Sequence, residues 1–460
     1  MNLHGPVRVA SAANPGKATV TISLDGWKDG RVGPTTLAIA VAAPKAGAKS
    51  EPVSPRYVRS LIHPERKASV PNVAFSPDGA KLLTSGYPSG IVQIWDPATG
   101  KELRRVETPR GSRGSPNYAH VSADWSTLYV TAGKQNAIKF ERDGKRMFRV
   151  ECEGEIRVWD LTTGKQKPPL KSATKNNLLD VRVTPDGGHL ITTERLPYES
   201  GEDDRAVSNA IDLRTGRARK LADGYGHPTF APDGKTVALA VAKIRPNVGQ
   251  IRLLDAATWK ELARWDAPAD RTCYGLVFSP DGKWLVVPES GEKGQILSLH
   301  VLNAATLTPA FALPSPLGKE GFSGFSRLRF TPDSESLLAS DATGKINVID
   351  VRANRIASSF ALPDQFRTWF MDLSPDGRTL AVNGQPVVEN GPPVDDDSLP
   401  EDLPQPRVFL FDLKSGKRVE EIVCPHSFWG GLAFSPDGKT LAVGGTGAVH
   451  LFDMTKVLSK

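Results

Sequence analysis

Phe-Ser-Pro-Asp-Gly, at Phe75–Gly79, recurs unchanged at Phe278–Gly282 and at Phe434–Gly438. Close variants fill the intervals, and a degenerate copy lies at His120–Ser126, so the chain holds eight copies. A period in the forties with several strand signals per unit is typical of a β-propeller blade. Successive copies lie 43 to 62 residues apart, measured between the aspartates at positions Asp78, Asp124, Asp186, Asp233, Asp281, Asp333, Asp376 and Asp437.

Each unit repeats one pattern of short apolar stretches separated by two kinds of turn. In Ser76–Gly79 the proline presets φ and the glycine tolerates the left-handed conformation, so the peptide closes a hairpin. Asp96–Gly100 makes the next reversal, because its aspartate accepts backbone N–H bonds within the turn. Four antiparallel strands per unit make a blade rather than a βαβ unit. The first unit places these strands at residues 73–75, 81–84, 91–95 and 101–106.

Two of the third strands end in Trp-Asp, at Trp95-Asp96 and at Trp159-Asp160, and in this the chain resembles the WD40 family. The resemblance runs over about 400 residues, from Pro55 to the end, and it implies an all-β propeller that serves as a non-catalytic protein-interaction scaffold. The chain departs from the family by lacking the Gly-His dipeptide before the first strand, so the family's buried Ser/Thr-His-Asp-Trp network is not expected. The repeat-defining residues are Asp78, Trp95, Asp96, Trp159, Asp160, Asp186, Asp233, Asp281, Asp376 and Asp437.

The closure of the ring can be inferred from the two ends of this region. The last unit has three strands and no fourth, whereas residues 56–61 form a strand signal that belongs to no unit of its own. An N-terminal strand that completes the last blade would remove two exposed sheet edges. We therefore expect eight blades; seven would require the unit of Asp124 to be a loop.

The first 50 residues are expected to form a separate part of the chain. Residues 18–24 and 36–43 read as two strands around a turn-rich segment, and Pro44–Pro55 reads as a linker. Two strands alone bury too little surface to be stable. The pair resembles the last hairpin of an immunoglobulin-like sandwich, of the kind that precedes WD40 propellers in large bacterial multidomain proteins, which would start the chain inside a longer reading frame. The alternative is a hairpin that packs on the propeller flank.

Composition limits the partners and the location. The net charge of +7 and the pI of about 9.2 are too mildly basic to imply nucleic acid, and no apolar run is long enough to cross a bilayer. No secretory leader is visible, so a cytoplasmic location is the default expectation for a monomeric propeller. Cys152, Cys273 and Cys424 show no metal-type spacing and are expected to be isolated thiols.

Extra length falls mainly between second and third strands, on the face opposite the Ser-Pro-Asp-Gly turns. The longer segments are 136–154, 194–209 and 385–406, together with 309–326 between two blades. A one-sided excess of loop length predicts a binding surface on this variable-loop face.

The insertions carry charges of opposite sign. Asp143-Gly144 predicts a two-residue hairpin turn that pairs Phe140 with Met147 and Glu141 with Arg146. The acidic runs that follow would repel a phosphate backbone, so a protein partner is expected rather than nucleic acid. The candidate binding residues are Lys139, Arg142, Lys145, Arg146, Glu202, Asp203, Asp204, Asp395, Asp396 and Asp397.

Motifs for catalysis are missing from the sequence. It contains no Gly-x-Ser-x-Gly elbow, Walker loop or His-Glu-x-x-His, and the acidic run near Asp395 lacks the spacing of an EF-hand, so no catalytic residue, metal or cofactor is predicted. The alternative is a propeller hydrolase or metal-dependent enzyme with its site at the central channel. Convergent histidines or carboxylates there would favour the enzyme, and an apolar or neutral channel the scaffold. His120, His227 and His426 are interpreted as loop or strand-end residues.

Overall fold

The structure of the chain is a computed structural model. It describes residues 18–22, 35–39, 54–66, 68–87, 89–107, 119–142, 145–171, 176–199, 206–244, 247–273, 275–291, 296–314, 328–340, 344–363, 366–386, 406–424 and 430–455. Within them there is no helix with the length and apolar character needed to cross a membrane.

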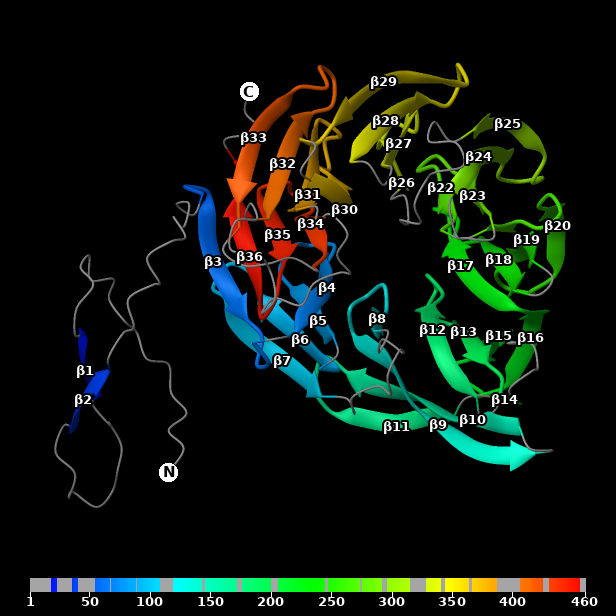
Figure 1. The fold of residues 1–460 in the computed structure, drawn as a ribbon, viewed down its shortest axis with the longest axis horizontal. Coiled ribbons are helices and arrows are strands. Elements are labelled where there is room, and N and C mark those ends of the chain that lie inside the picture. The colour runs from blue at the N-terminus through cyan, green and yellow to red at the C-terminus, as the bar shows by residue number, and fades with distance from the viewer. Residues whose placement is uncertain are drawn as a thin grey trace. The chain divides into compact units, whose positions relative to one another are not determined.

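Eight antiparallel sheets stand side by side around a ring, which is the expected eight-bladed propeller (Figure 1). The inner strand is written first in each blade below. Blade 1 is β4 (Ser69–Phe75), β5 (Leu82–Tyr87), β6 (Ile91–Asp96) and β7 (Lys101–Glu107), and blade 2 is β8 (Ala119–Val121), β9 (Thr127–Arg142), β10 (Lys145–Asp160) and β11 (Gln166–Lys171). Blade 3 is β12 (Asn177–Val183), β13 (His189–Arg195), β15 (Ala206–Asp212) and β16 (Ala218–Asp223), and blade 4 is β17 (Tyr225–Phe230), β18 (Thr236–Ile244), β19 (Asn247–Asp255) and β20 (Glu261–Asp266).

The remaining blades continue the same order. Blade 5 has two short inner strands, β21 (Thr272–Cys273) and β22 (Val277–Phe278), followed by β23 (Trp284–Ser290), β24 (Ile296–Asn303) and β25 (Pro309–Pro314). Blade 6 is β26 (Leu328–Phe330), β27 (Ser336–Ser340), β28 (Lys345–Asp350) and β29 (Arg355–Ala361). Blade 7 is β30 (Phe366–Leu373), β31 (Thr379–Pro386), β32 (Arg407–Asp412) and β33 (Arg418–Val423), and blade 8 is β34 (Leu432–Phe434), β35 (Thr440–Gly444), β36 (Ala448–Asp453) and β3 (Tyr57–Ile62).

The unit of Asp124 forms a complete sheet, so the seven-blade alternative is wrong. Ring closure by the N-terminal strand is confirmed, because β3 pairs with β36 in the register Leu61↔Val449. Leu61 is 2% exposed in this position. Arg56, just before β3, also forms an ion pair with Glu420 on blade 7. The closing strand therefore ties together the last two blades.

The repeated turns hold each blade by the same hydrogen bonds. The Ser76 hydroxyl donates to Asp78 Oδ1 at 2.6 Å and accepts from the backbone N–H of Lys81 at 2.9 Å, while Gly79 takes φ +71°. In the second kind of turn, the Thr99 hydroxyl donates to Asp96 Oδ2 at 2.7 Å, and Asp96 Oδ1 accepts from the backbone N–H groups of Thr99 and Ala98. These bonds lower the pKa of Asp78 and of Asp96, because the ionised carboxylate is the better acceptor.

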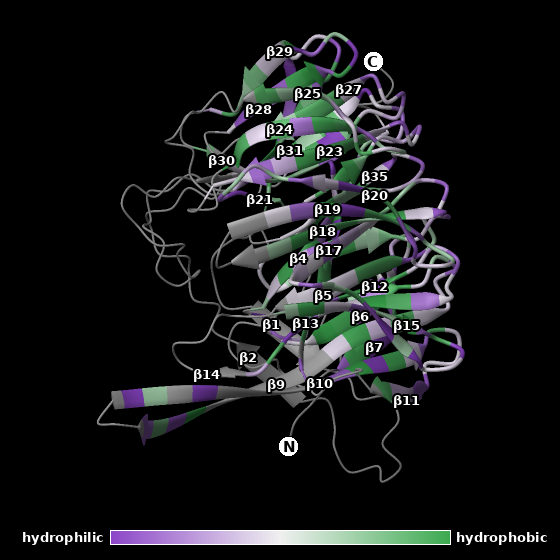
Figure 2. Ribbon diagram, turned by 90° about the vertical axis from the view of Figure 1, so that its right-hand side faces the viewer, coloured by the Kyte–Doolittle hydropathy of each residue, from purple (hydrophilic) through white to green (hydrophobic). Residues whose placement is uncertain are grey.

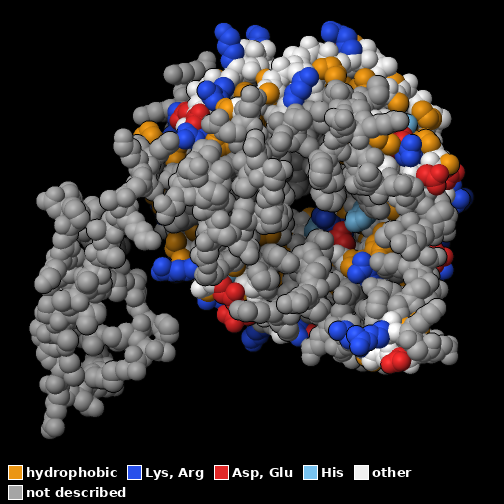
Figure 3. Space-filling model, in the orientation of Figure 1, with side chains coloured by type: hydrophobic (Ala, Val, Ile, Leu, Met, Phe, Trp, Pro, Cys, Tyr) orange, Lys and Arg blue, Asp and Glu red, His pale blue; other side chains and the backbone are white. Residues whose placement is uncertain are grey.

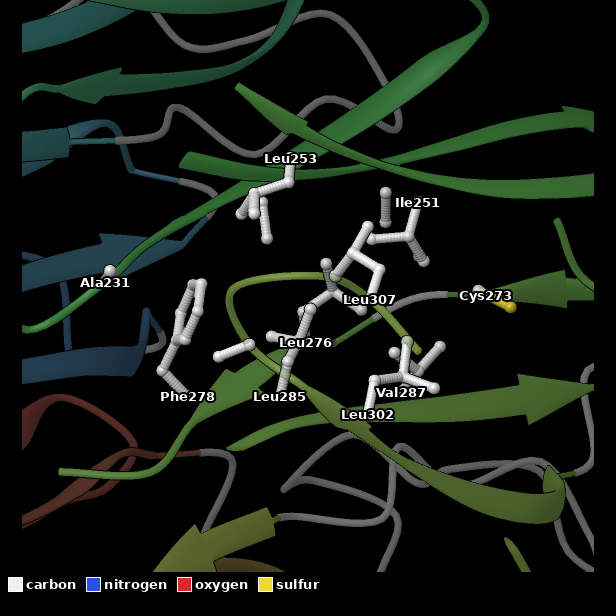
Figure 4. Packing of buried hydrophobic residues seen from close by; sticks show 13 residues of the cluster. Ala231, Ile251, Leu253, Cys273, Leu276, Phe278, Leu285, Val287, Leu302 and Leu307 are labelled. Carbon is white, nitrogen blue, oxygen red and sulfur yellow. The ribbon is translucent and has the colours of Figure 1, made fainter. Parts of the chain in front are cut away.

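The apolar core is distributed between neighbouring blades rather than gathered at one centre. Figure 4 shows Ile251 and Leu253 of β19 across from Leu285 and Val287 of β23, at the junction of blades 4 and 5. All four side chains are at most 1% exposed. Each blade buries both of its faces, so the ring needs no second layer of structure.

The first blade keeps part of the buried network that the sequence did not predict. The Trp95 indole donates to Thr84 Oγ1 at 3.0 Å inside the blade. His63 is 2% exposed, and its Nε2 lies 3.2 Å from Ser89 Oγ. These two bonds share no residue and neither includes an aspartate, so they are separate parts of such a network and not the connected whole.

Residues 18–22 and 35–39 form a separate two-stranded sheet. β1 (Ala18–Ile22) pairs antiparallel with β2 (Thr35–Ile39), in the register Ala18↔Ile39 to Ile22↔Thr35. The pairing agrees with the hairpin expected from the alternating sequence.

Candidate functional site

The longest strands in the described part of the chain form an arm on blade 2. β9 and β10 have 16 residues each and pair without a break from Thr127↔Asp160 to Arg142↔Lys145. The predicted pairs Phe140↔Met147 and Glu141↔Arg146 are confirmed. Figure 2 shows the ends of β9 and β10 projecting away from the other blades. Because the connection between second and third strands lies opposite the repeated turns, the arm stands on the variable-loop face.

The arm presents cations beside apolar side chains. Lys139, Arg146 and Arg149 are exposed, and the Arg149 guanidinium lies 6.0 Å from the centre of the Phe140 ring. Phe140 is half-buried, and Ile138 is 44% exposed. Arg142 and Lys145 occupy the strand ends, as expected. An exposed mixture of this kind suits contact with another macromolecule.

A short strand joins the insertion of blade 3 to this arm. β14 (Tyr198–Glu199) pairs with β10 in the register Arg149↔Glu199 and Val150↔Tyr198. The sequence did not predict this pairing, because a two-residue strand has no periodicity to detect. The insertions of two neighbouring blades therefore form one continuous surface, which we call the arm surface: β14 and the residues of β9 and β10 from 136 to 151.

Other predicted binding residues cannot be placed on the arm surface. Glu202, Asp203 and Asp204 lie outside the described residues, as do Asp395, Asp396 and Asp397. Two predicted insertions are shorter than expected. In blade 3, strands continue to Arg195 and resume at Ala206, and Pro309–Pro314 is the outer strand of blade 5 rather than a connection. The prolines at both ends of Pro309–Pro314 hid this strand, because proline cannot donate to a strand ladder and so argues against a strand prediction.

The inner strands line a central channel, and the repeat alignment identifies the residues that face it. In β12, Val181 and Val183 are buried in the blade core, whereas Arg182 is exposed at the inner edge of the ring. Arg182 lies two positions before the Ser/Thr that opens the repeated turn. The equivalent residues of the eight blades are Ala74, His120, Arg182, Thr229, Val277, Arg329, Asp372 and Ala433.

Charged and imidazole side chains gather in the hollow at the centre of the ring, as Figure 3 shows. On one side, Arg182 Nε lies 3.3 Å from Asp180 Oδ2 within β12. On the other, Arg329 of β26 donates to Asp372 of β30. The side chains of Asp180 and Asp372 are 10% and 12% exposed, whereas those of Arg182 and Arg329 are 45% and 51% exposed. The charge that solvent reaches in the channel is therefore positive.

Two channel residues also link neighbouring blades. His120 Nδ1 accepts the backbone N–H of Val183 on the next blade at 3.4 Å, and Asp372 Oδ2 accepts that of Phe434 at 2.8 Å. Burial and the charge of Arg182 lower the pKa of His120 to about 4, so its imidazole is neutral at pH 7. Burial likewise lowers the pKa of His227, although solvent reaches its side chain through the channel.

The interpretation of His120 and His227 as loop or strand-end residues is therefore wrong. Both lie within inner strands, β8 and β17, and the channel is neither apolar nor neutral. Their position relative to the repeated turn could have revealed this, but only by comparing equivalent positions across blades. His426 lies outside the described residues. Among the residues that are described, no three His, Cys, Asp or Glu side chains converge as metal ligands.

One further polar cluster deserves comparison with a nucleophilic site. Glu289 Oε2 lies 2.5 Å from His300 Nε2, and Ser298 Oγ lies 3.0 Å from the same nitrogen. A relay needs the serine and the carboxylate on different ring nitrogens, so this arrangement cannot activate the hydroxyl. Arg271 also donates to Glu289, at 3.1 Å. The cluster instead satisfies a carboxylate that is buried between strands.

The cysteines offer no reactive thiolate at the described positions. Cys273 and Cys424 are buried and free, as expected of isolated thiols. Burial raises the pKa of the Cys273 thiol to about 12 and also raises that of Cys424. Both groups are therefore protonated at neutral pH and are poor nucleophiles.

Comparison with known proteins agrees with this architecture. The family model "WD domain, G-beta repeat" matches residues 56–96, the segment from the start of β3 to the end of β6. The "Periodic tryptophan protein 2 homolog" of Dictyostelium discoideum is 22% identical over 415 residues, which cover 84% of this chain and 39% of that protein. The chain thus spans about two fifths of the length of this relative. The crystal structure of the C-terminal WD40 domain of Sif2 superposes with a TM-score of 0.57 at 12% identity, covering 86% of this chain and 98% of that one, a likeness of fold. The repeat and the fold are those of WD40 propellers.

Proposed function

We propose that this WD40-type propeller is a non-catalytic scaffold that binds a protein partner through its variable-loop face. WD40 propellers typically act as protein-interaction scaffolds. The observation that carries the proposal is the pairing of β14 with β10, which joins the insertions of blades 2 and 3 into the arm surface. Loops that pair with each other across blades present a preformed surface, and preformed surfaces lose less entropy on binding.

The chemistry of the arm surface indicates the kind of partner. Lys139, Arg146 and Arg149 are exposed close to the exposed Ile138. Cations at a rim steer an acidic partner, while apolar and aromatic side chains supply the affinity. We assign the acidic insertions near Glu202–Asp204 and Asp395–Asp397 to the same face, where they would select a partner with charges of both signs.

Charge reversal tests the binding face. The native partner is first captured from a lysate of the source cells and identified, and its affinity for the purified chain is then measured. Reversal of Arg142, Lys145 and Arg146 to glutamate should weaken binding by about tenfold, mainly through a slower association rate, and the loss should shrink at high salt. Reversal of Asp395, Asp396 and Asp397 to lysine should weaken it in the same way.

The control places the same charge change on the opposite face. Lys101 and Lys165 are exposed beside the repeated turns, so Lys101→Glu with Lys165→Glu leaves the arm surface intact. This variant should bind as the wild type does. Loss of the partner in the control, with retention in the arm variant, would show that the binding face is assigned to the wrong side.

The second candidate function is a metal-dependent enzyme at the channel, which the presence of His120, His227 and Asp180 favours. The donor set argues against it. Asp180 is held by the Val181 N–H at 2.8 Å and by the Arg182 guanidinium, and His120 Nδ1 accepts a backbone N–H. Metal analysis of the purified, dialysed chain should give well under about one ion per chain, because such sites need several convergent ligands. Stoichiometric metal would instead establish the enzyme as the better candidate.

We further propose that the β1–β2 hairpin is the end of an immunoglobulin-like sandwich, in a protein of the large multidomain kind known from bacteria. The support is the antiparallel register of two alternating strands, which cannot form a core by themselves. Residues 1–52 produced alone should therefore lack a cooperative thermal transition by circular dichroism. A cooperative transition would show that the hairpin segment is a domain of its own.

A further inference from the structure

The channel contains two arginines that the propeller fold does not require. The same repeat position holds alanine in blades 1 and 8, threonine in blade 4 and valine in blade 5. At two other blades it holds a hydrogen-bond acceptor, His120 or Asp372, which bonds to the backbone of the next blade. An arginine has no acceptor and cannot make that bond. Arg329 links two blades in another way, through its ion pair with Asp372 of blade 7. Arg182 forms its ion pair with Asp180 of its own strand. Arg182 must therefore be explained by something other than blade packing.

Each arginine is held at one edge by a buried carboxylate and leaves the rest of its guanidinium exposed. Arg182 uses Nε toward Asp180, and its Nη atoms make no hydrogen bond with any described residue. Asp180 is 7% exposed and also accepts the Val181 N–H. A guanidinium oriented in this way presents two parallel N–H donors, the geometry that matches a carboxylate or phosphate group.

Only Arg182 has imidazoles beside it. His120 on β8 and His227 on β17 flank β12. Burial is the main cause of the lowered pKa of both histidines, and the charge of Arg182 lowers both further, although at His227 the charge of Asp180 acts in the opposite direction. Because His120 Nδ1 accepts the Val183 N–H, the neutral ring carries its proton on Nε2, and that N–H is a donor. The neighbours of Arg329 at the equivalent position are Val277 and Asp372, which offer no such donor.

We propose that the channel holds a binding site for a small oxyanion, a carboxylate or a phosphate group, formed by Arg182, His120 and His227. This site is separate from the arm surface and does not depend on the proposed scaffold function. The bound group accepts the two Nη donors of Arg182 and the Nε2–H of His120, and His227 closes the site from blade 4. We call the face of the ring that carries the repeated turns the turn face. Arg182 and His120 lie two residues before the turn in their blades, so the site is near the end of the channel that opens on the turn face.

Binding of inorganic phosphate and of citrate to the purified chain tests this site. Affinity is measured by isothermal titration at constant ionic strength, with sodium chloride as the blank. Arg182→Gln should weaken binding at least about tenfold, the effect of losing one charge-assisted hydrogen-bond pair. Arg329→Gln removes a similarly exposed arginine that also contacts an aspartate, here on the next blade, and it should change the affinity less than about twofold. Binding of phosphate alone would identify the group as a phosphate, and binding of citrate alone as a carboxylate.

A measurement on the wild-type chain keeps the test independent of how the variants fold. Phenylglyoxal labels exposed arginines, and the adducts are mapped by mass spectrometry. Phosphate or citrate should protect Arg182 and leave Arg329 and Arg264 reactive. The proposal is overturned by any of three results: neither anion binds saturably, both glutamine variants bind equally, or protection is the same at all three arginines.

Discussion

The turn face of this propeller repeats nearly the same residues in every blade, whereas the channel has different residues from blade to blade. On the turn face seven of the eight repeated turns make the same bond, in which a Ser or Thr hydroxyl donates to the turn aspartate at 2.5 or 2.6 Å. In the channel, only a few residues away, equivalent positions hold alanine, valine, threonine, histidine, arginine or aspartate. Both regions use the same strands.

This difference separates the residues that stabilise every blade from the residues that make one blade different from another. A turn hydroxyl satisfies a backbone N–H that the hairpin leaves without a strand partner, and seven of the eight blades use one. Most channel side chains meet solvent, so residues of different size and charge fit at that position. Residues that vary around the ring, including the insertions of the arm surface, are therefore the better guide to function. Three predictions test this division.

The largest effect is expected where a blade is incomplete without a distant segment. Deletion of residues 1–62 removes β3 and leaves β36 without its outer partner, so the ring should lose at least about 5 kcal/mol, of which Leu61 alone accounts for about 2–5. Deletion of residues 1–50 leaves β3 in place and should change stability little. Thermal unfolding of both truncations decides the matter, and equal melting temperatures would contradict closure by β3.

Sequence reasoning succeeded where one physical rule acts within a few residues. The proline, aspartate and glycine of Ser76–Gly79 specify a turn locally, and the structure has that turn in every blade. The register of the arm followed from Asp143-Gly144 by counting outward, because strand pairing has a period of two. Closure by residues 56–61 followed from counting strands in the last unit.

The rest depended on contacts between segments that are far apart in sequence. β14 pairs with β10 through only two residues, about 50 positions away, and nothing in Tyr198-Glu199 indicates that partner. The channel cluster forms because β8, β12 and β17 come side by side at the ring centre. His120 and Arg182 belong to different repeats, so neither motif contains the site.

The second prediction concerns the channel and the stability of the fold in acid. His120 has a pKa of about 4 in the folded chain against about 6.5 in the unfolded chain. The unfolded state therefore binds the proton first as the pH falls. The free energy of unfolding should decline between pH 6.5 and 4 by up to about 3 kcal/mol through this residue alone, and then level off.

The variant His120→Gln isolates that contribution. Glutamine can still accept the Val183 N–H, but it does not titrate, and the carboxylates that also destabilise the fold in acid are common to both proteins. Urea unfolding at pH 7 and at pH 4.5 should show a smaller loss for the variant than for the wild type. Identical pH profiles would mean that His120 protonates freely in the folded channel.

The smallest effect is expected at the one repeated turn that breaks the rule of its face. Blade 4 has Ala231 where the other blades have Ser or Thr, and the Asp233 carboxylate there accepts the Lys235 N–H but no turn hydroxyl. Ala231→Ser should supply the missing hydroxyl, which can donate to Asp233 and accept a backbone N–H. Each such hydrogen bond contributes about 0.5–1.5 kcal/mol net, and the cost of burying the hydroxyl cancels part of the gain, so the chain should be stabilised by about 1 kcal/mol. Ala231 is 8% exposed, close to the 3% of Ser76, so the side chain has an equivalent place.

The matched change in blade 5 should have the opposite sign. Ser279 donates to Asp281 at 2.6 Å and accepts from the Trp284 N–H at 3.0 Å, so Ser279→Ala should destabilise the chain by about 1–2 kcal/mol because it leaves a buried N–H without its side-chain acceptor. Both variants are compared by urea unfolding at pH 7, where the turn aspartates are ionised. If Ala231→Ser destabilises the chain while Ser279→Ala is neutral, the repeated hydroxyl does not stabilise the turn. The residues of the turn face would then be no more required by the fold than the residues of the channel are.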